Sequence, residues 1–130
     1  MRRTLLSERL VKPAFRYSHL VNVGPHWYLS GLLAQDRKSG ALVGNNVGAQ
    51  AEKILENLQV LMDEFGLGFE HLAMARIFTT EMQNFSQINA AWEKLFDSIE
   101  HLPPARTSVG VAALPLNAAV EMEFTFYREA

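Results

Sequence analysis

Residues 103–111 read PPARTSVGV, and after a short link residues 120–127 read VEMEFTFY. In both segments apolar residues alternate with polar or small ones, which is the period of a β-strand with one buried face. The first segment carries Arg106 near its start, and the second carries Glu121 near its start. If the two strands pair as neighbours across the link at 113–119, we expect Arg106 and Glu121 to lie near the same end of the sheet.

An arginine and a glutamate held close together have a definite chemical use. A guanidinium binds a carboxylate through two parallel hydrogen bonds, and a nearby carboxylate can move protons on a water molecule. The pair therefore suggests hydrolysis of a small acid. Taken singly, each residue also has an ordinary interpretation, because Arg106 could form a surface salt bridge and Glu121 could lie on the solvent face of the last strand.

A helix is predicted upstream, where apolar residues recur at helical spacing from Ile54 to Phe65. They form one stripe over three turns, which is typical of a helix packed on a core. Either Asn45 or Asn46 can cap its first turn by accepting from free backbone amides. Gly66 ends the helix, since glycine readily adopts the left-handed conformation found there.

A second helix is predicted from Phe85 to about His101, with Asn84 as its cap and the prolines at 103–104 preventing its extension. Asn89 falls on the apolar stripe of this helix, an unusual place for an amide. It could satisfy a backbone carbonyl in the core.

Strand character marks the rest of the chain. We predict a short edge strand at 9–12, a hairpin of strands 17–23 and 27–33 around a turn at 24–26, and an inner strand at 71–80 that is apolar on both sides. The order of elements predicts one α+β domain over residues 1–130, a mixed sheet with two helices packed on one face.

Composition excludes several classes of site and partner. The chain has no cysteine, so disulfides and thiol catalysis are impossible, and its four histidines show no metal-ligand spacing; we expect them in surface or capping roles. That spacing gives no reason to expect a metal. No nucleic-acid partner is expected, because the net charge is −2, and no membrane partner is expected, because no apolar run reaches about 18 residues. The basic residues among the first sixteen are interpreted as a solvated face. A cytoplasmic location is expected.

Several segments together resemble the RidA/YjgF family. They include PARTSV at 104–109, LP at 114–115 and VEME at 120–123. YLSG at 28–31, the stretch 50–58, RIFTT at 76–80 and the NF…INAAW pattern at 84–92 also resemble that family, in order and at its spacing. The resemblance extends from about residue 17 to residue 126.

The resemblance implies a chorismate-mutase-like subunit in a homotrimer, with clefts between the subunits. It implies hydrolysis of reactive 2-imino acids, in equilibrium with 2-enamino acids, to 2-oxo acids and ammonia, with no cofactor. Arg106 would bind the substrate carboxylate and Glu121 would place or deprotonate the water. The remaining residues implied to line the cleft are Tyr17, Ser30, Gly31, Asn89 and Ser108.

Some positions depart from the family pattern. Phe15 and Arg16 precede Tyr17, His19 replaces a glutamine, and Leu32 replaces the glutamine that usually follows Ser-Gly. Ser108 stands where many members have cysteine. Arg16 suggests a substrate with a second acidic group, such as a dicarboxylate.

Two other functions are weighed against deaminase chemistry. One is a trimer that binds 2-oxo acids or related metabolites without turnover. The other is a ribonuclease, an activity name attached to relatives. It is disfavoured because the chain is acidic overall and shows no interleaving of aromatic and basic residues.

Overall fold

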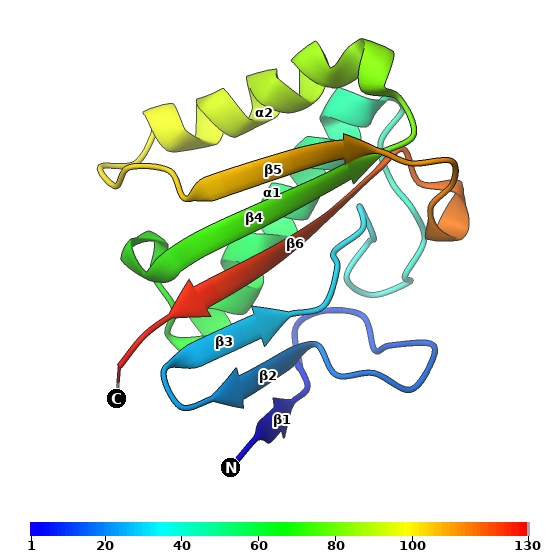
Figure 1. Ribbon diagram of the computed structural model, residues 1–130. Helices are drawn as coiled ribbons and strands as arrows, with labels where there is room; N and C mark the ends of the chain where they lie inside the picture. The colour runs from blue at the N-terminus through cyan, green and yellow to red at the C-terminus, as the bar shows by residue number, and fades with distance from the viewer. Residues whose placement is uncertain (130) are drawn as a thin grey trace.

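The computed structural model describes residues 1–129 and contains a six-stranded sheet with helices on one face (Figure 1). The strands are β1 (Arg3–Leu5), β2 (Leu20–Val23), β3 (His26–Leu29), β4 (Leu72–Thr79), β5 (Ala105–Gly110) and β6 (Val120–Tyr127). The α-helices are α1 (Val47–Phe65) and α2 (Phe85–Asp97), and the 3₁₀ turns are η1 (Phe69–His71), η2 (Met82–Asn84) and η3 (Pro115–Asn117). The strand order is β1-β2-β3-β6-β4-β5. Only β4 and β5 pair in parallel, so the sheet is mixed, as predicted.

The core lies between the sheet and the helices. Every second residue of β6 is buried on the helix side, and the same holds for the second half of β4. Each large apolar side chain removed from water there stabilises the fold by roughly 1.5–3 kcal/mol. The residues concerned in β6 are Val120, Met122, Phe124 and Phe126, and those in α1 include Ile54, Leu58 and Leu61. Neither α1 nor α2 covers the opposite face of the sheet (Figure 1).

The first helix begins and ends where local chemistry predicts. Asn46, and not Asn45, is the N-cap, and its side chain accepts from the backbone N–H of Ala49 at 2.8 Å. Gly66 follows the helix with φ 69°, a left-handed conformation that is strained for residues with a side chain. The predicted boundaries of α1 are therefore confirmed.

The hairpin of β2 and β3 is confirmed, although its strands are shorter than predicted. The predicted edge strand at 9–12 is wrong, and β1 takes the edge position beside β2. Local bonds explain the difference, because the Ser7 hydroxyl oxygen accepts from the backbone N–H groups of Arg9 and Leu10 at 3.0 and 2.9 Å. A side chain that binds the backbone two and three residues onward favours a turn over an extended strand.

The second helix is shorter than predicted at its C-terminal end. It ends at Asp97, before His101, because the Ser98 hydroxyl donates to the Leu95 carbonyl at 2.6 Å and the Ser98 N–H bonds to the same carbonyl. Asn84 precedes the helix but does not cap it, since its amide donates to Glu81 at 2.8 Å.

The expected pairing of the last two strands is also wrong. β4 lies between β5 and β6, so these strands are not neighbours. Parallel strands need a long crossover, and α2 supplies it between β4 and β5. A hairpin would in any case have placed the first residues of β5 beside the last residues of β6, away from Glu121.

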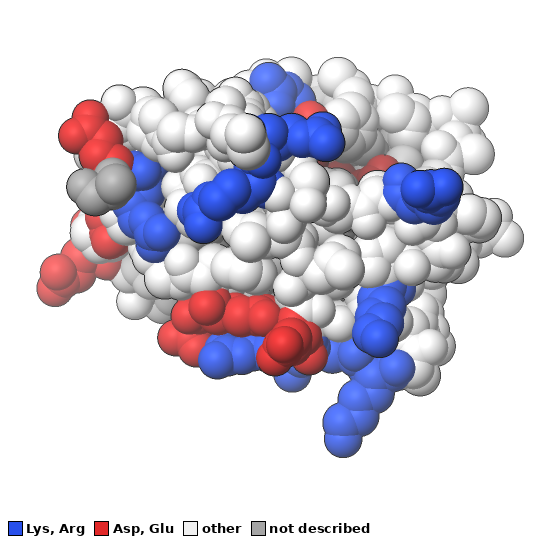
Figure 2. Space-filling view, turned by 90° about the horizontal axis from the view of Figure 1, so that it is seen from below, with Lys and Arg blue, Asp and Glu red and all other residues white. Residues whose placement is uncertain are grey.

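Two of the basic residues near the N-terminus, Arg3 and Arg9, bind separate partners. Arg3 donates to Asn22 at 2.8 Å, and Arg9 pairs with Asp63 at 2.7 Å. Figure 2 shows Lys and Arg side chains in separate groups on the face it presents, with uncharged and acidic groups between them. None of the helices in residues 1–129 is long and apolar enough to cross a membrane.

Candidate functional site

A hollow of about 600 Å³ opens beside the start of β6. Four of the residues expected to line a cleft are brought together there: Tyr17, Ser30, Gly31 and Glu121. The rest of its wall comes from the N-terminal segment, the loop after β3 and η3: Val11, Lys12, Ala14, Phe15, Leu33, Gln35, Ser39, Gly40, Pro115 and Leu116. The hollow therefore collects residues from three distant parts of the chain around one carboxylate.

Gly31 allows the carboxylate to approach the backbone. A Cβ atom at position 31 would lie 2.6 Å from Oε2 of Glu121 and 2.9 Å from its Cδ, so a side chain there would displace the Glu121 carboxylate from its present place. The neighbouring residue Leu32 exchanges backbone hydrogen bonds with Met122, so the two segments are fixed side by side. Leu32 itself is buried in the core and does not line this hollow.

Ser30 ties the N-terminal segment to the end of β3. Its N–H donates to the His19 carbonyl at 3.0 Å, and its hydroxyl donates to the Ser18 carbonyl at 2.6 Å. His19 is buried, contrary to the expected surface or capping role, and its Nε2 lies 2.9 Å from the Val11 carbonyl oxygen. These bonds hold Tyr17 and its neighbours against the hollow.

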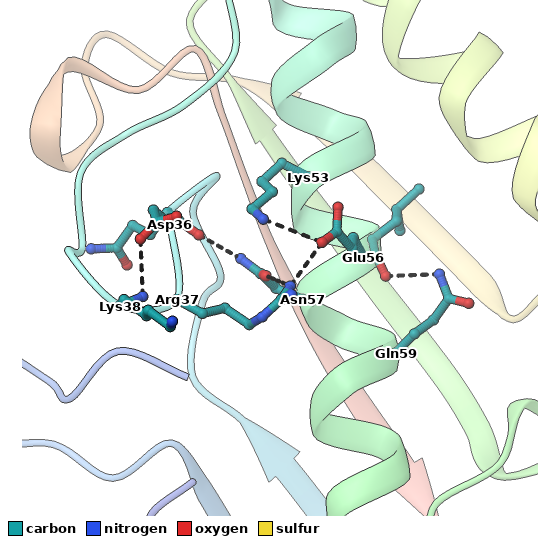
Figure 3. Close-up of polar contacts among 9 residues, drawn as sticks. Asp36, Arg37, Lys38, Lys53, Glu56, Asn57 and Gln59 are labelled. Carbon is teal, nitrogen blue, oxygen red and sulfur yellow. Dashed lines mark hydrogen bonds and ion pairs between the residues drawn. The ribbon is translucent and has the colours of Figure 1, made fainter. Parts of the chain in front are cut away.

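Helix α1 holds the loop that forms the outer wall (Figure 3). The amide of Asn57 donates to the Gln35 carbonyl at 2.9 Å and accepts from Arg37 at 3.0 Å. Arg37 also pairs with Glu56 at 2.8 Å. Asp36 accepts from the N–H groups of Ser39 and Lys38 within the same loop, which lowers the pKa of its carboxyl.

Asn57 is a positioning residue whose role was not predicted from the sequence. It is buried, and it lies on the helix directly before Leu58, within the apolar stripe. A polar residue on the apolar side of an amphipathic helix must find a buried partner. That signal was present in the sequence but did not indicate which partner.

Glu121 lies half-buried on the face of β6 opposite the core. Burial raises the pKa of its carboxyl, and the nearby negative charge of Glu123 raises it further. Within residues 1–129 no basic side chain forms an ion pair with Glu121, because Arg76 pairs with Glu123 instead, at 3.4 Å. The carboxylate is thus available to accept a proton from a molecule in the hollow.

Arg106 lies at a second place, on the edge strand β5. Its guanidinium carbon is 5.2 Å from the ring centre of Trp92 and 5.6 Å from that of Phe85, both on α2. Aromatic faces stabilise a cation at these distances. The ordinary interpretation as a surface salt bridge is not supported, since in the described part of the chain no carboxylate lies within 4.0 Å of Arg106.

Asn89 and Ser108 lie on the same side of the sheet as Arg106. Asn89 falls between Phe85 and Trp92 on one face of α2, and its Oδ1 is buried without a hydrogen-bond partner in residues 1–129. Ser108 follows Arg106 by two residues on β5, and therefore points to the same face. The second place thus offers the unused donors of Arg106, beside one buried amide oxygen that has no partner within residues 1–129.

The two places lie on opposite faces of one subunit. Arg106 pairs with Ala75 of β4, whereas Glu121 pairs with Phe78 three residues later. An odd separation along a strand reverses the face, and three residues correspond to a shift of about 10 Å. The expectation that Arg106 and Glu121 lie near the same end of the sheet is therefore wrong within a subunit.

Comparison with known proteins gives consistent matches along nearly the whole chain. The family model described as Endoribonuclease L-PSP matches residues 7–127. Protein DfrA of Myxococcus xanthus is 34% identical over 124 residues, which are 94% of this chain and 92% of that protein. The crystal structure of the YjgF gene product from E. coli has a TM-score of 0.89 at 27% identity, covering 98% of this chain and 99% of that one. E. coli TdcF with bound serine has a TM-score of 0.89 at 25% identity, with the same coverage.

Proposed function

The chain belongs to the Endoribonuclease L-PSP family, and from this membership we propose that it hydrolyses reactive 2-imino acids, in equilibrium with 2-enamino acids, to 2-oxo acids and ammonia as a homotrimer. The RidA/YjgF resemblance agrees with this family. The observation that carries the proposal is Glu121, a half-buried carboxylate with a raised pKa that faces a hollow and forms no ion pair within residues 1–129.

The position of Arg106 supports a site that two subunits share. One subunit presents Glu121 on one face and Arg106 on the other, so neither face alone holds both groups. Contact between two different faces of identical subunits is heterologous, and repeating it by a rotation that closes gives a ring. In a ring of three, the Arg106 face of each subunit meets the Glu121 hollow of the next.

The proposed chemistry uses few groups because a protonated imine is already electrophilic. Arg106 binds the substrate carboxylate and thereby fixes the position of C2. Water attacks C2 while Glu121 takes its proton, which gives a carbinolamine. Glu121 then returns the proton to nitrogen, the C–N bond breaks as ammonia leaves, and Glu121 accepts the hydroxyl proton as the C=O bond of the 2-oxo group forms.

The test uses 2-iminobutyrate generated by an amino-acid oxidase in the presence of semicarbazide. Semicarbazide traps the imine, so a protein that hydrolyses the imine first lowers the initial rate of semicarbazone formation. We expect this effect from the wild-type protein and its loss in Arg106→Ala and Glu121→Gln. Arg9→Ala and Glu93→Gln are matched controls that remove the same charges at exposed positions outside the hollow. Full activity in Arg106→Ala would show that Arg106 does not bind the substrate carboxylate.

The second candidate function is binding without turnover. It is favoured by the structural likeness to TdcF, which was solved with bound serine. Calorimetry with 2-oxobutyrate separates the two functions. Affinity that depends on Arg106, together with no effect on imine hydrolysis, would support a binding protein in place of an enzyme.

A further inference from the structure

We propose that Leu116 is a specificity-determining residue that makes this site prefer 2-imino acids with bulky apolar side chains. The inference rests on the proposed deaminase function. It comes from the conformation and position of Leu116.

Leu116 has a backbone conformation that its side chain disfavours. Its φ is 59° and its ψ is 21°, and Asn117 follows with φ 56°. Asparagine tolerates this left-handed region, whereas a residue such as leucine rarely occupies it. Packing in the core does not compensate, because Leu116 is 55% exposed. Core packing therefore does not explain the strained backbone of this exposed apolar residue, and strain of this kind is typical of functional sites.

Buried hydrogen bonds on the β6 side of η3 hold this conformation in place. The N–H of Ala119 donates to the buried amide of Gln50 at 2.9 Å, and the Ala119 carbonyl accepts from the Thr79 hydroxyl at 2.7 Å. The Ala118 N–H closes the turn on the Pro115 carbonyl at 3.1 Å. Because these contacts fix the backbone, Leu116 is held at the wall of the hollow that contains Glu121.

The wall beyond Glu121 is largely hydrocarbon. Besides Leu116, it includes Phe15, which is 83% exposed, together with Val11, Ala14 and Leu33. A substrate side chain directed away from the carboxylate would meet these groups and remove their surface from water. The suggested preference for a dicarboxylate was based on Arg16. Arg16 is not among the residues that line the hollow, so this structure does not support that preference. Lys12 is the basic residue of the wall.

The experiment compares imines derived from leucine, alanine and glutamate, each generated by a suitable oxidase. We expect kcat/KM for the leucine-derived imine to exceed that for the alanine-derived imine by about tenfold or more, in the range that added methylenes give in an apolar pocket. Leu116→Gly should lower this ratio by about tenfold while the protein stays folded, since glycine adopts a positive φ without strain. Leu102→Gly, at a position 89% exposed and outside the hollow, is the matched control and should leave the ratio unchanged.

The outcomes separate the two proposals. Acceleration of no imine at all would reject the deaminase function itself. Hydrolysis of all three imines with equal efficiency, or an unchanged ratio in Leu116→Gly, would overturn the role of Leu116 and leave the function standing. A preference for the glutamate-derived imine would also overturn it and would indicate Lys12 as the specificity residue. Leu116→Asn, which also tolerates the left-handed backbone, replaces the glycine variant if that one fails to fold.

Discussion

Glu121 combines two environmental effects that act in the same direction. Partial removal from water disfavours its charged form, and the negative charge of Glu123 disfavours it further. Both raise the pKa of the Glu121 carboxyl above its ordinary value of 4.5. In the proposed reaction the ionised form accepts a proton from water, and a base with a raised pKa accepts that proton more readily.

This environment predicts the acid limb of the pH profile. Activity should fall as the pH decreases through the raised pKa of Glu121, because protonation removes the base. Glu123→Gln removes the neighbouring negative charge, and this lowers the pKa of Glu121. The midpoint of the limb in kcat/KM should therefore move to lower pH in that variant, measured after subtraction of spontaneous hydrolysis. A shift to higher pH would contradict the assignment of the limb to Glu121.

At the scale of elements, α1 determines much of the hollow. Its N-cap fixes where the helix begins, and Asn57 on the same helix binds the 35–40 loop that forms the outer wall. Two turns nearer the N-terminus, Gln50 anchors the segment before β6. One helix thus positions two walls of the site.

The N-cap of α1 offers a matched pair of variants. Asn46→Ala should lower the free energy of unfolding by about 1 kcal/mol, because the Ala49 N–H loses its acceptor. Asn45→Ala should have a clearly smaller effect, since Asn45 lies outside the cap. Denaturant titrations at one fixed protein concentration measure both. Equal losses in the two variants would show that the cap does not act as described.

At the scale of the whole molecule, the separation of Arg106 from Glu121 predicts complementation between inactive subunits. Neither Arg106→Ala nor Glu121→Gln should be active alone. Refolding or co-expression of the two in equal amounts should restore about a quarter of the wild-type activity, because with random mixing one cleft in four receives both intact groups. The mixed assembly should sediment as a trimer. No recovery from a fully mixed trimer would contradict a site that two subunits share.

Local patterns in the sequence determined both α-helices and the buried face of β6, although not the edge strand β1. Val120, Met122, Phe124 and Phe126 alternate with polar residues, and the buried face of β6 follows from that alternation alone. Asparagine and glycine likewise determine the ends of α1, because a cap depends on residues within one turn of the helix.

Tertiary structure decided which elements became neighbours and which face each candidate residue reached. Periodicity states that a strand has an apolar side, but it does not identify the adjacent strand, so the insertion of β4 between β5 and β6 could not be read from 103–127. The hollow at Glu121 and the placement of Arg106 on the opposite face both depend on that insertion. Strand order is set by the joint packing of distant segments on one core, and no single stretch of sequence contains that information.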